Sequence, residues 1–154
     1  MGYLERNLME GETVVYRTKL HWIVLLPALL LAIVLVVGAV AVVVFYPKVW
    51  PASLALLIVA VAVMLGPMIR IAASEFAVTN RRVAIKIGFV HRRSLEMVLS
   101  KVESIAVDQG MGARLLGYGT LTVRGTGGTP ETFERIRAPL EFRRHVNEQL
   151  AARA

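Results

Sequence analysis

The side chains that most often perform catalysis or bind metals are scattered through this sequence. The three histidines, His21, His91 and His145, stand far apart and lack the short spacing of a zinc site. The sequence contains neither a G-x-S-x-G nor an H-E-x-x-H motif, and it has no cysteine. We therefore expect a protein that is not an enzyme and that holds no metal and no cofactor.

Two further patterns resemble reactive sites but fit structural roles better. The glycines of residues 125–128 precede Pro130 and a strand pattern, whereas a phosphate-binding loop requires Gly-Lys-Ser/Thr and a helix. A hairpin turn accounts for these glycines. Glu103 and Asp108 are five positions apart, and this odd spacing puts their carboxylates on opposite faces of a strand. Neither pattern predicts a catalytic site.

Four arginines form the remaining candidate site. Arg81 and Arg82 lie at the end of one predicted strand, and Arg92 and Arg93 lie at the end of the next. We expect the four side chains to form one basic patch. Such a patch is either the charged, solvated edge of a sheet or a contact for anionic lipid headgroups or a protein partner.

The elements that must position these residues are arranged around a long apolar stretch, residues 22–69, whose only charged residue is Lys48. It divides into two runs, 22–46 and 50–69, and about 20 apolar residues are enough to cross a bilayer as a helix. A cleaved signal peptide does not fit, because a second apolar run follows at once. We predict a transmembrane hairpin over residues 21–70. Its expected interface residues are Trp22, Tyr46, Lys48, Trp50 and Arg70.

The distribution of positive charge predicts how this hairpin is oriented. Of the 18 lysines and arginines, three precede the hairpin, one lies at its tip and fourteen follow it. The positive-inside rule therefore places both termini in the cytoplasm, with the hairpin in the cell (inner) membrane. The net charge of +7 is spread among acidic residues without a basic block, which favours attraction to a membrane surface and argues against nucleic acid as a partner.

After the apolar stretch the pattern changes to alternating apolar and polar residues, which is typical of strands with one buried face. In the strand predicted over residues 82–87, Val83 and Ile85 are expected to face inward and Arg82 outward. An alternating segment before the hairpin, residues 12–20, supplies a seventh strand if it joins the others. The six strands expected after the hairpin cover residues 75–79, 82–87, 89–98, 102–108, 120–124 and 131–137.

Helical patterns in the second half of the chain are short. A single helical turn is expected at residues 113–116, and Pro139 is expected to open a terminal helix. The apolar stripe of that helix consists of Phe142, Val146 and Leu150. We therefore predict an α+β membrane protein, in which residues 1–20 and 71–154 form one cytoplasmic domain and the hairpin is inserted into it.

Several stretches of this sequence resemble the bacterial pleckstrin-homology-like membrane proteins (the bPH2, YdbS-like or membrane-flanked domain family). They are the Gly-Glu-x-Val of residues 11–14 and the segments 75–83, 87–96, 100–109 and 114–128. The resemblance implies a seven-stranded, strongly bent sheet or partly open barrel capped by a C-terminal helix. It also implies a membrane-attached module without enzymatic activity, with soluble relatives that form homo-oligomeric rings.

Small residues in the apolar runs predict that the chain forms a homo-oligomer. Alanine and glycine recur in both runs, and small residues let membrane helices approach closely. A bent sheet is also expected to leave a strand edge open for pairing. The expected function is a self-associating scaffold or protein-interaction platform in contact with membrane lipids. The alternative is a sensor of anionic headgroups that uses the four arginines.

Overall fold

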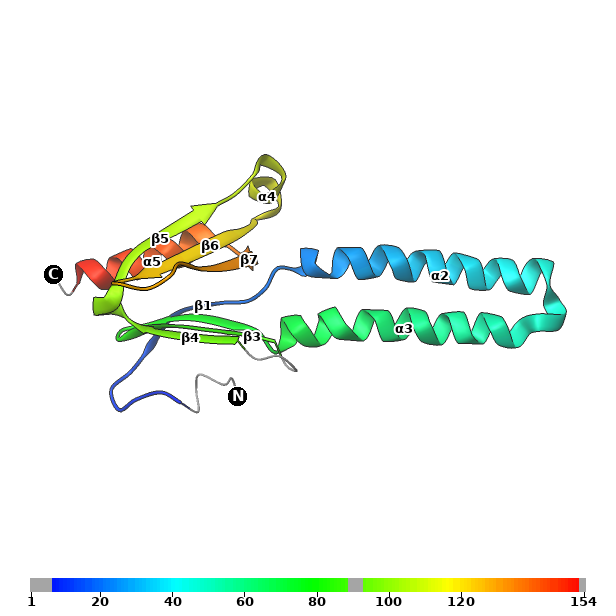
Figure 1. Cartoon of the computed structure of the whole chain (residues 1–154), viewed down its shortest axis with the longest axis horizontal. Coiled ribbons are helices and arrows are strands. Elements are labelled where there is room, and N and C mark those ends of the chain that lie inside the picture. The colour runs from blue at the N-terminus through cyan, green and yellow to red at the C-terminus, as the bar shows by residue number, and fades with distance from the viewer. Residues whose placement is uncertain (1–6, 89–92, 153–154) are drawn as a thin grey trace. The chain divides into compact units, whose positions relative to one another are not determined.

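The computed structural model describes residues 7–88 and 93–152. The chain divides into two compact units (Figure 1). The first unit consists of Met1–His21 and Ala73–Ala154, and the second is the segment Trp22–Ala72 between them. Each unit is described by itself below.

The second unit contains two long apolar helices. They are 24 and 26 residues long with their short 3₁₀ turns included, which is long and apolar enough to cross a membrane. The few buried side chains in the two helices are small and include Ala32, Ala39, Ser53 and Ala60, so the helices pack where their backbones can approach. The elements are η1 (Trp22–Leu25), α2 (Leu26–Phe45), η2 (Pro47–Val49) and α3 (Trp50–Ala72).

The predicted interface residues lie at the ends of these helices and are exposed. Trp22 opens η1, and Arg70 lies in the last turn of α3. Tyr46, Lys48 and Trp50 lie in or beside the turn that joins α2 to α3. The two apolar helices make this chain a membrane-associated protein.

The described residues of the first unit form seven strands in two antiparallel sheets, which do not close into a barrel. This arrangement confirms the predicted α+β class and the seven strands. One sheet has the order β1-β2-β3-β4, with strands Val14–Thr18, Glu75–Thr79, Arg82–Ile87 and Arg93–Val98. The other has the order β5-β6-β7, with strands Val102–Asp108, Tyr118–Gly125 and Glu131–Arg137. The helical elements are η3 (Leu99–Lys101), α4 (Met111–Leu116) and α5 (Pro139–Ala151).

The strand before the apolar helices lies in the same sheet as the strands after them. Thr18 at the end of β1 is paired with Phe76 near the start of β2, and Val14 with Thr79. The chain therefore leaves the first unit after β1 and returns before β2 at one end of the sheet. We call this end the junction end, and the end formed by the β2–β3 turn the distal end.

Backbone hydrogen bonds join the two sheets on the side of β1 and β7. The segment after β1 runs beside β7, where the His21 N–H donates to the Arg135 carbonyl at 2.7 Å and the Arg137 N–H donates to the Lys19 carbonyl at 3.0 Å. A bridge between Leu20 and Ile136 continues this contact. On the other side, the outer edges of β4 and β5 have no ladder partner within the described parts of the chain.

The hydrophobic core of this unit lies between the two sheets and under α5. Phe76 from one sheet meets Phe133 from the other edge-to-face, with ring centroids 6.1 Å apart. Phe142 and Val146 of α5 are fully buried, which confirms that the terminal helix packs on the core through its predicted stripe. Leu150, the third residue of that stripe, is partly buried.

Candidate functional site

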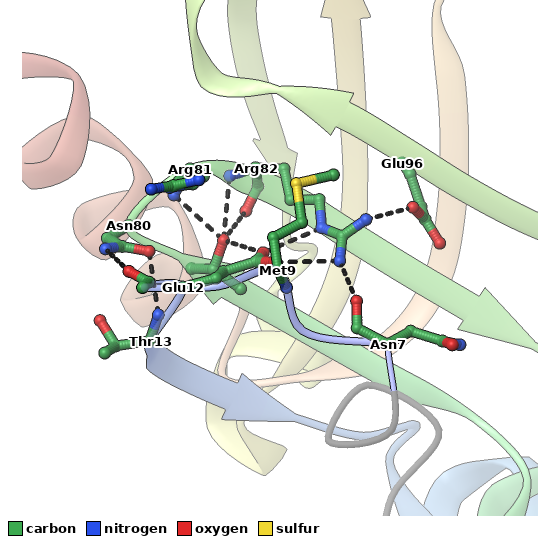
Figure 2. Close-up of polar contacts among 10 residues, drawn as sticks. Asn7, Met9, Glu12, Thr13, Asn80, Arg81, Arg82 and Glu96 are labelled. Carbon is green, nitrogen blue, oxygen red and sulfur yellow. Dashed lines mark hydrogen bonds and ion pairs between the residues drawn. The ribbon is translucent and has the colours of Figure 1, made fainter.

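The prediction that Arg82 faces outward is wrong, because the segment before β1 folds over this side chain at the distal end. Its Nε donates to Oε1 of Glu12 at 2.9 Å, and its Nη2 donates to Oε2 of the same carboxylate at 3.0 Å. Nη1 donates to Glu96 at 2.6 Å and Nη2 to the Asn7 carbonyl at 2.6 Å (Figure 2). Arg82 is only 7% exposed, and the Glu12 side chain is completely buried.

The remaining hydrogen-bonding positions of Glu12 are also occupied. The Thr79 hydroxyl donates to its Oε1 at 2.8 Å, and the Met9 N–H donates to its Oε2 at 2.8 Å. Burial by itself raises the pKa of the Glu12 carboxyl, but the hydrogen bonds from Met9, Arg82 and Thr79 outweigh it, so the pKa lies below its ordinary value. The hydrogen bonds to Glu12 raise the pKa of Arg82. Both groups are therefore charged at neutral pH.

Neighbouring side chains also hold the segment before β1 against the β2–β3 turn. The Asn80 side chain accepts from the Thr13 N–H at 3.0 Å and donates to the Gly11 carbonyl at 3.1 Å. The Thr79 hydroxyl also accepts from the N–H groups of Arg81 and Arg82, which closes the β2–β3 turn. The cluster around Arg82 and Glu12 thus attaches the segment Asn7–Thr13 to the sheet. We assign it a structural role.

Sequence reasoning missed Glu12 and Thr79 as partners of Arg82. Glu12 and Arg82 are 70 positions apart, and no local pattern connects them. The only available signal was the Gly-Glu-x-Val stretch within the family resemblance, which carried no indication of a partner.

Antiparallel pairing keeps the four arginines from forming one patch. Arg82 is opposite Val98 at the distal end of the β3–β4 pair, whereas Arg93 is opposite Ile87 at the junction end. The Arg93 guanidinium also forms an ion pair with Glu131 and lies over the Phe133 ring. The prediction of one patch placed both arginine pairs at neighbouring strand ends, but the first residues of two strands that pair antiparallel lie at opposite ends.

The other two arginines of the predicted patch differ in what the structure shows. Arg81 is exposed at the distal turn, next to Arg82. Arg92 lies outside the described residues, so its side chain is not placed.

Beside Arg81 and Arg82, an open cavity of about 300 Å³ is lined by these two arginines together with Met9 and Val98. Met9 and Val98, the last residue of β4, are each about half exposed, so apolar surface is accessible at this end of the strand.

The open side of the two sheets presents two strand edges. Along β4 the exposed residues are Arg93, Ser94, Glu96 and Val98. Along β5 they are Glu103, Ser104, Ala106 and Asp108. A strand edge without a ladder partner presents a row of backbone N–H and C=O groups that can pair with another strand.

The junction end is closed by an aromatic contact. The His21 ring stacks on Tyr118 with centroids 5.2 Å apart and an interplanar angle of 28°. Burial and the positive charge of Arg137 lower the pKa of His21, so the ring is neutral at pH 7. His21 is therefore a packing residue at the point where the chain leaves the first unit.

Within residues 7–88 and 93–152, no group of three or more His, Cys, Asp or Glu side chains is placed to hold a metal ion.

Comparison with protein families gives a match to the bacterial PH domain over residues 20–152. Comparison with curated proteins and with solved structures gives no match. The family match covers both apolar helices and most of the folded unit, including all strands after the hairpin and the terminal helix. This chain therefore belongs to the bacterial PH domain family.

Proposed function

We propose that this protein is a non-enzymatic, membrane-anchored interaction module that associates with further copies of itself through its open sheet edges. The observation that carries the proposal is the pair of strand edges at β4 and β5, which have no ladder partner among residues 7–88 and 93–152. The fold supports recognition by backbone pairing, in which a strand of a second molecule extends the sheet.

The surroundings of β4 support the docking of a strand there. Main-chain pairing supplies affinity in this mode of recognition, and pockets beside the edge supply specificity. The cavity lined by Met9, Arg81, Arg82 and Val98 lies at the last residue of β4 and offers both apolar and cationic contacts. It is suited to a side chain of the incoming strand.

The two edges also favour a second copy as the partner. Pairing β4 of one molecule with β5 of the next joins two different surfaces, and such head-to-tail contacts form a ring when the rotation closes. A closed ring removes both edges from solvent, which lowers the risk of uncontrolled strand pairing. Small residues in α2 and α3, such as Gly38 and Gly66, favour association of the apolar helices as well.

The alternative function is a sensor of anionic lipid headgroups that uses Arg81, Arg82, Arg92 and Arg93. The arrangement of the described arginines favours the interaction module, because Arg82 is buried in ion pairs and Arg93 is paired with Glu131 at the other end of the sheet. Arg81 at the distal turn is exposed and forms no ion pair with another residue of the described ranges 7–88 and 93–152. It is the residue on which a headgroup contact would depend.

Cysteine cross-linking between co-expressed copies tests the strand pairing. One copy carries Ser94→Cys on β4 and the other Ala106→Cys on β5; the wild-type chain has no cysteine. We expect a disulfide between the two copies in membranes and none when either variant is expressed alone. The matched control replaces Ser94→Cys with Thr126→Cys, in the exposed β6–β7 turn.

The size of the solubilised particle provides the second measurement. Mass photometry in mild detergent should show a particle with several copies of the 16.9 kDa chain. A monomer at all concentrations, without the 94–106 cross-link, would reject self-association. If that monomer also binds anionic vesicles in a salt-sensitive way that Arg81→Gln abolishes, the lipid-sensor function replaces the proposal.

A further inference from the structure

Helix α4 (Met111–Leu116) carries the most exposed large apolar side chains of the described residues. Met111 is 93% exposed, Leu115 88% and Leu116 45%. No residue of α4 is buried, so these side chains add nothing to the core. Met111 and Leu115 are four residues apart and therefore lie on one face of the helix. Clustered exposed apolar side chains of this kind mark a surface that contacts something apolar.

The base of α4 is firmly attached to the sheet. Gly117, with φ of 76°, ends the helix in the left-handed conformation, and its carbonyl accepts from the Ala138 N–H at 2.9 Å. The Gln109 side-chain amide donates to the Tyr118 carbonyl at 2.7 Å on the other side of the loop. The helix is thus held in one place by contacts on both of its flanks, and the apolar pair is presented at a defined position.

That position is the junction end of the first unit. Helix α4 connects the end of β5 to the start of β6, and Tyr118, the first residue of β6, is paired with Arg137. Tyr118 also stacks on His21, and the next residue, Trp22, begins the apolar helical segment. Leu116 precedes Tyr118 by two residues, or two Cα–Cα steps of about 3.8 Å each. The chain itself therefore keeps α4 close to the point where it enters the apolar helices.

We propose that α4 is a second membrane-contacting element, which inserts Met111 and Leu115 into the boundary between the headgroups and the acyl chains of the bilayer. Helices that lie in this boundary bury an apolar face by about 5–10 Å and present cations to the phosphates. Arg114, exposed in the same helix, supplies such a cation, and Arg137 is a further exposed cation at this end. Asp108, at the end of β5, is the acidic residue nearest to α4 in the sequence. Because anionic headgroups repel its carboxylate, it favours a shallow position of the helix.

The partner is the bilayer because the apolar residues and the membrane entry point lie at the same end of the unit. A second copy is the other possible apolar partner, and the experiment below distinguishes the two. The inference goes beyond the pairing of strand edges and does not depend on it, since β4 and β5 contribute none of the inserting side chains.

Fluorescence quenching in the full-length protein tests the insertion. Leu115→Cys is labelled with an environment-sensitive dye, and the protein is reconstituted in nanodiscs of phosphatidylcholine and phosphatidylglycerol that contain a lipid with a spin label near the headgroup. We expect a blue-shifted emission that the spin-labelled lipid quenches. The matched control carries the dye at Thr126→Cys. Thr126 follows the far end of β6, about 25 Å along the strand from Tyr118.

The result is decided by comparing the two positions. Quenching at position 115 that is several-fold stronger than at 126 supports the proposal, and equal quenching overturns it. A blue shift at position 115 without lipid quenching, together with a 115–115 disulfide between copies of the unlabelled Leu115→Cys variant, shows a protein contact and also overturns it. Adding Met111→Ser should lower the inserted fraction about tenfold, because the pair inserts together. Unchanged quenching in that variant would show that the apolar face is not what inserts.

Discussion

The substitution Arg82→Met tests whether the buried cluster at the β2–β3 turn holds the segment before β1 onto the sheet. Methionine keeps much of the length and apolar volume of arginine but removes the charge and every hydrogen bond. In the variant, the Glu12 carboxylate loses both of its bonds to the guanidinium while its side chain stays completely buried. Glu96 and the Asn7 carbonyl each lose one bond.

The expected loss of stability is about 3–5 kcal/mol, which is the usual cost of removing one partner from a buried ion pair. A second estimate agrees, because two hydrogen bonds to a charged acceptor contribute about 1.5–3 kcal/mol each. The bond to Glu96 adds little, since that side chain is 41% exposed and water replaces its partner. A loss of this size is a large part of the stability of a domain of ordinary size.

The free energy of unfolding of the first unit can be measured in the full-length protein in nanodiscs. Urea titration with pulse proteolysis reports the unfolded fraction while the apolar helices remain in the bilayer. The matched control is Arg144→Met in α5, which removes an exposed arginine with two carboxylate partners, Glu141 and Glu148. We expect its urea midpoint to stay close to that of the wild type, because exposed ion pairs contribute little.

A double-mutant cycle with Glu12→Gln separates the ion pair from the rest of the cluster. In the double variant no unpaired charge remains buried at position 12, so the two losses should not add, and we expect a coupling of about 2 kcal/mol or more. The reasoning fails if Arg82→Met costs less than about 1 kcal/mol or no more than Arg144→Met. Additive losses would show that Glu12 and Arg82 act independently.

Three further predictions concern pH, packing and topology. The folded-state pKa of Glu12 lies below its ordinary value of about 4.5, so the ionised carboxylate stabilises the fold above that pH. The wild type should therefore have a higher free energy of unfolding than Glu12→Gln at neutral pH, and this difference should shrink as the pH falls below 4.5 in the same urea assay. Gly119→Ala should destabilise the unit by about 1–3 kcal/mol in urea titration, because the added Cβ would lie 2.8 Å from the Asp108 carbonyl oxygen. A Cβ added at Gly112 meets no such atom within 4 Å, so Gly112→Ala should stabilise α4 slightly in the same assay. A cysteine in place of Lys48 should react with an impermeant thiol reagent in intact cells and one in place of Thr126 should not; the opposite labelling would refute cytoplasmic termini.

Local sequence patterns predicted the elements of this fold well. The strands over residues 75–79, 82–87, 102–108 and 131–137 have the predicted bounds, because alternation reports directly which face of a strand is buried. The two apolar helices followed from length and hydropathy in the same way. The helical turn predicted at residues 113–116 is the end of α4, and its glycine-rich flanks indicated a break in the strands.

The candidate site was less predictable, because it depends on which segments meet. The register of β3 and β4 separates Arg82 from Arg93, and no property of either strand alone sets that register. The pattern at Arg82 predicted a solvent-facing side chain, since alternation assumes that one face of the sheet is open. Residues before β1 cover that face, and a pattern confined to residues 82–87 contains no trace of them.

The sequence by itself therefore determined the membrane-associated helices, the number of strands and the apolar stripe of α5, since each follows from the periodicity of neighbouring residues. Only the tertiary structure decided that Glu12 neutralises Arg82 across 70 positions and that α4 lies at the junction end. The same is true of the division of the strands into two sheets, in which β4 and β5 are edge strands within the described residues. These features arise from pairing between distant segments. Long-range pairing is fixed by the combined packing of the whole core, so no single stretch of sequence reports it.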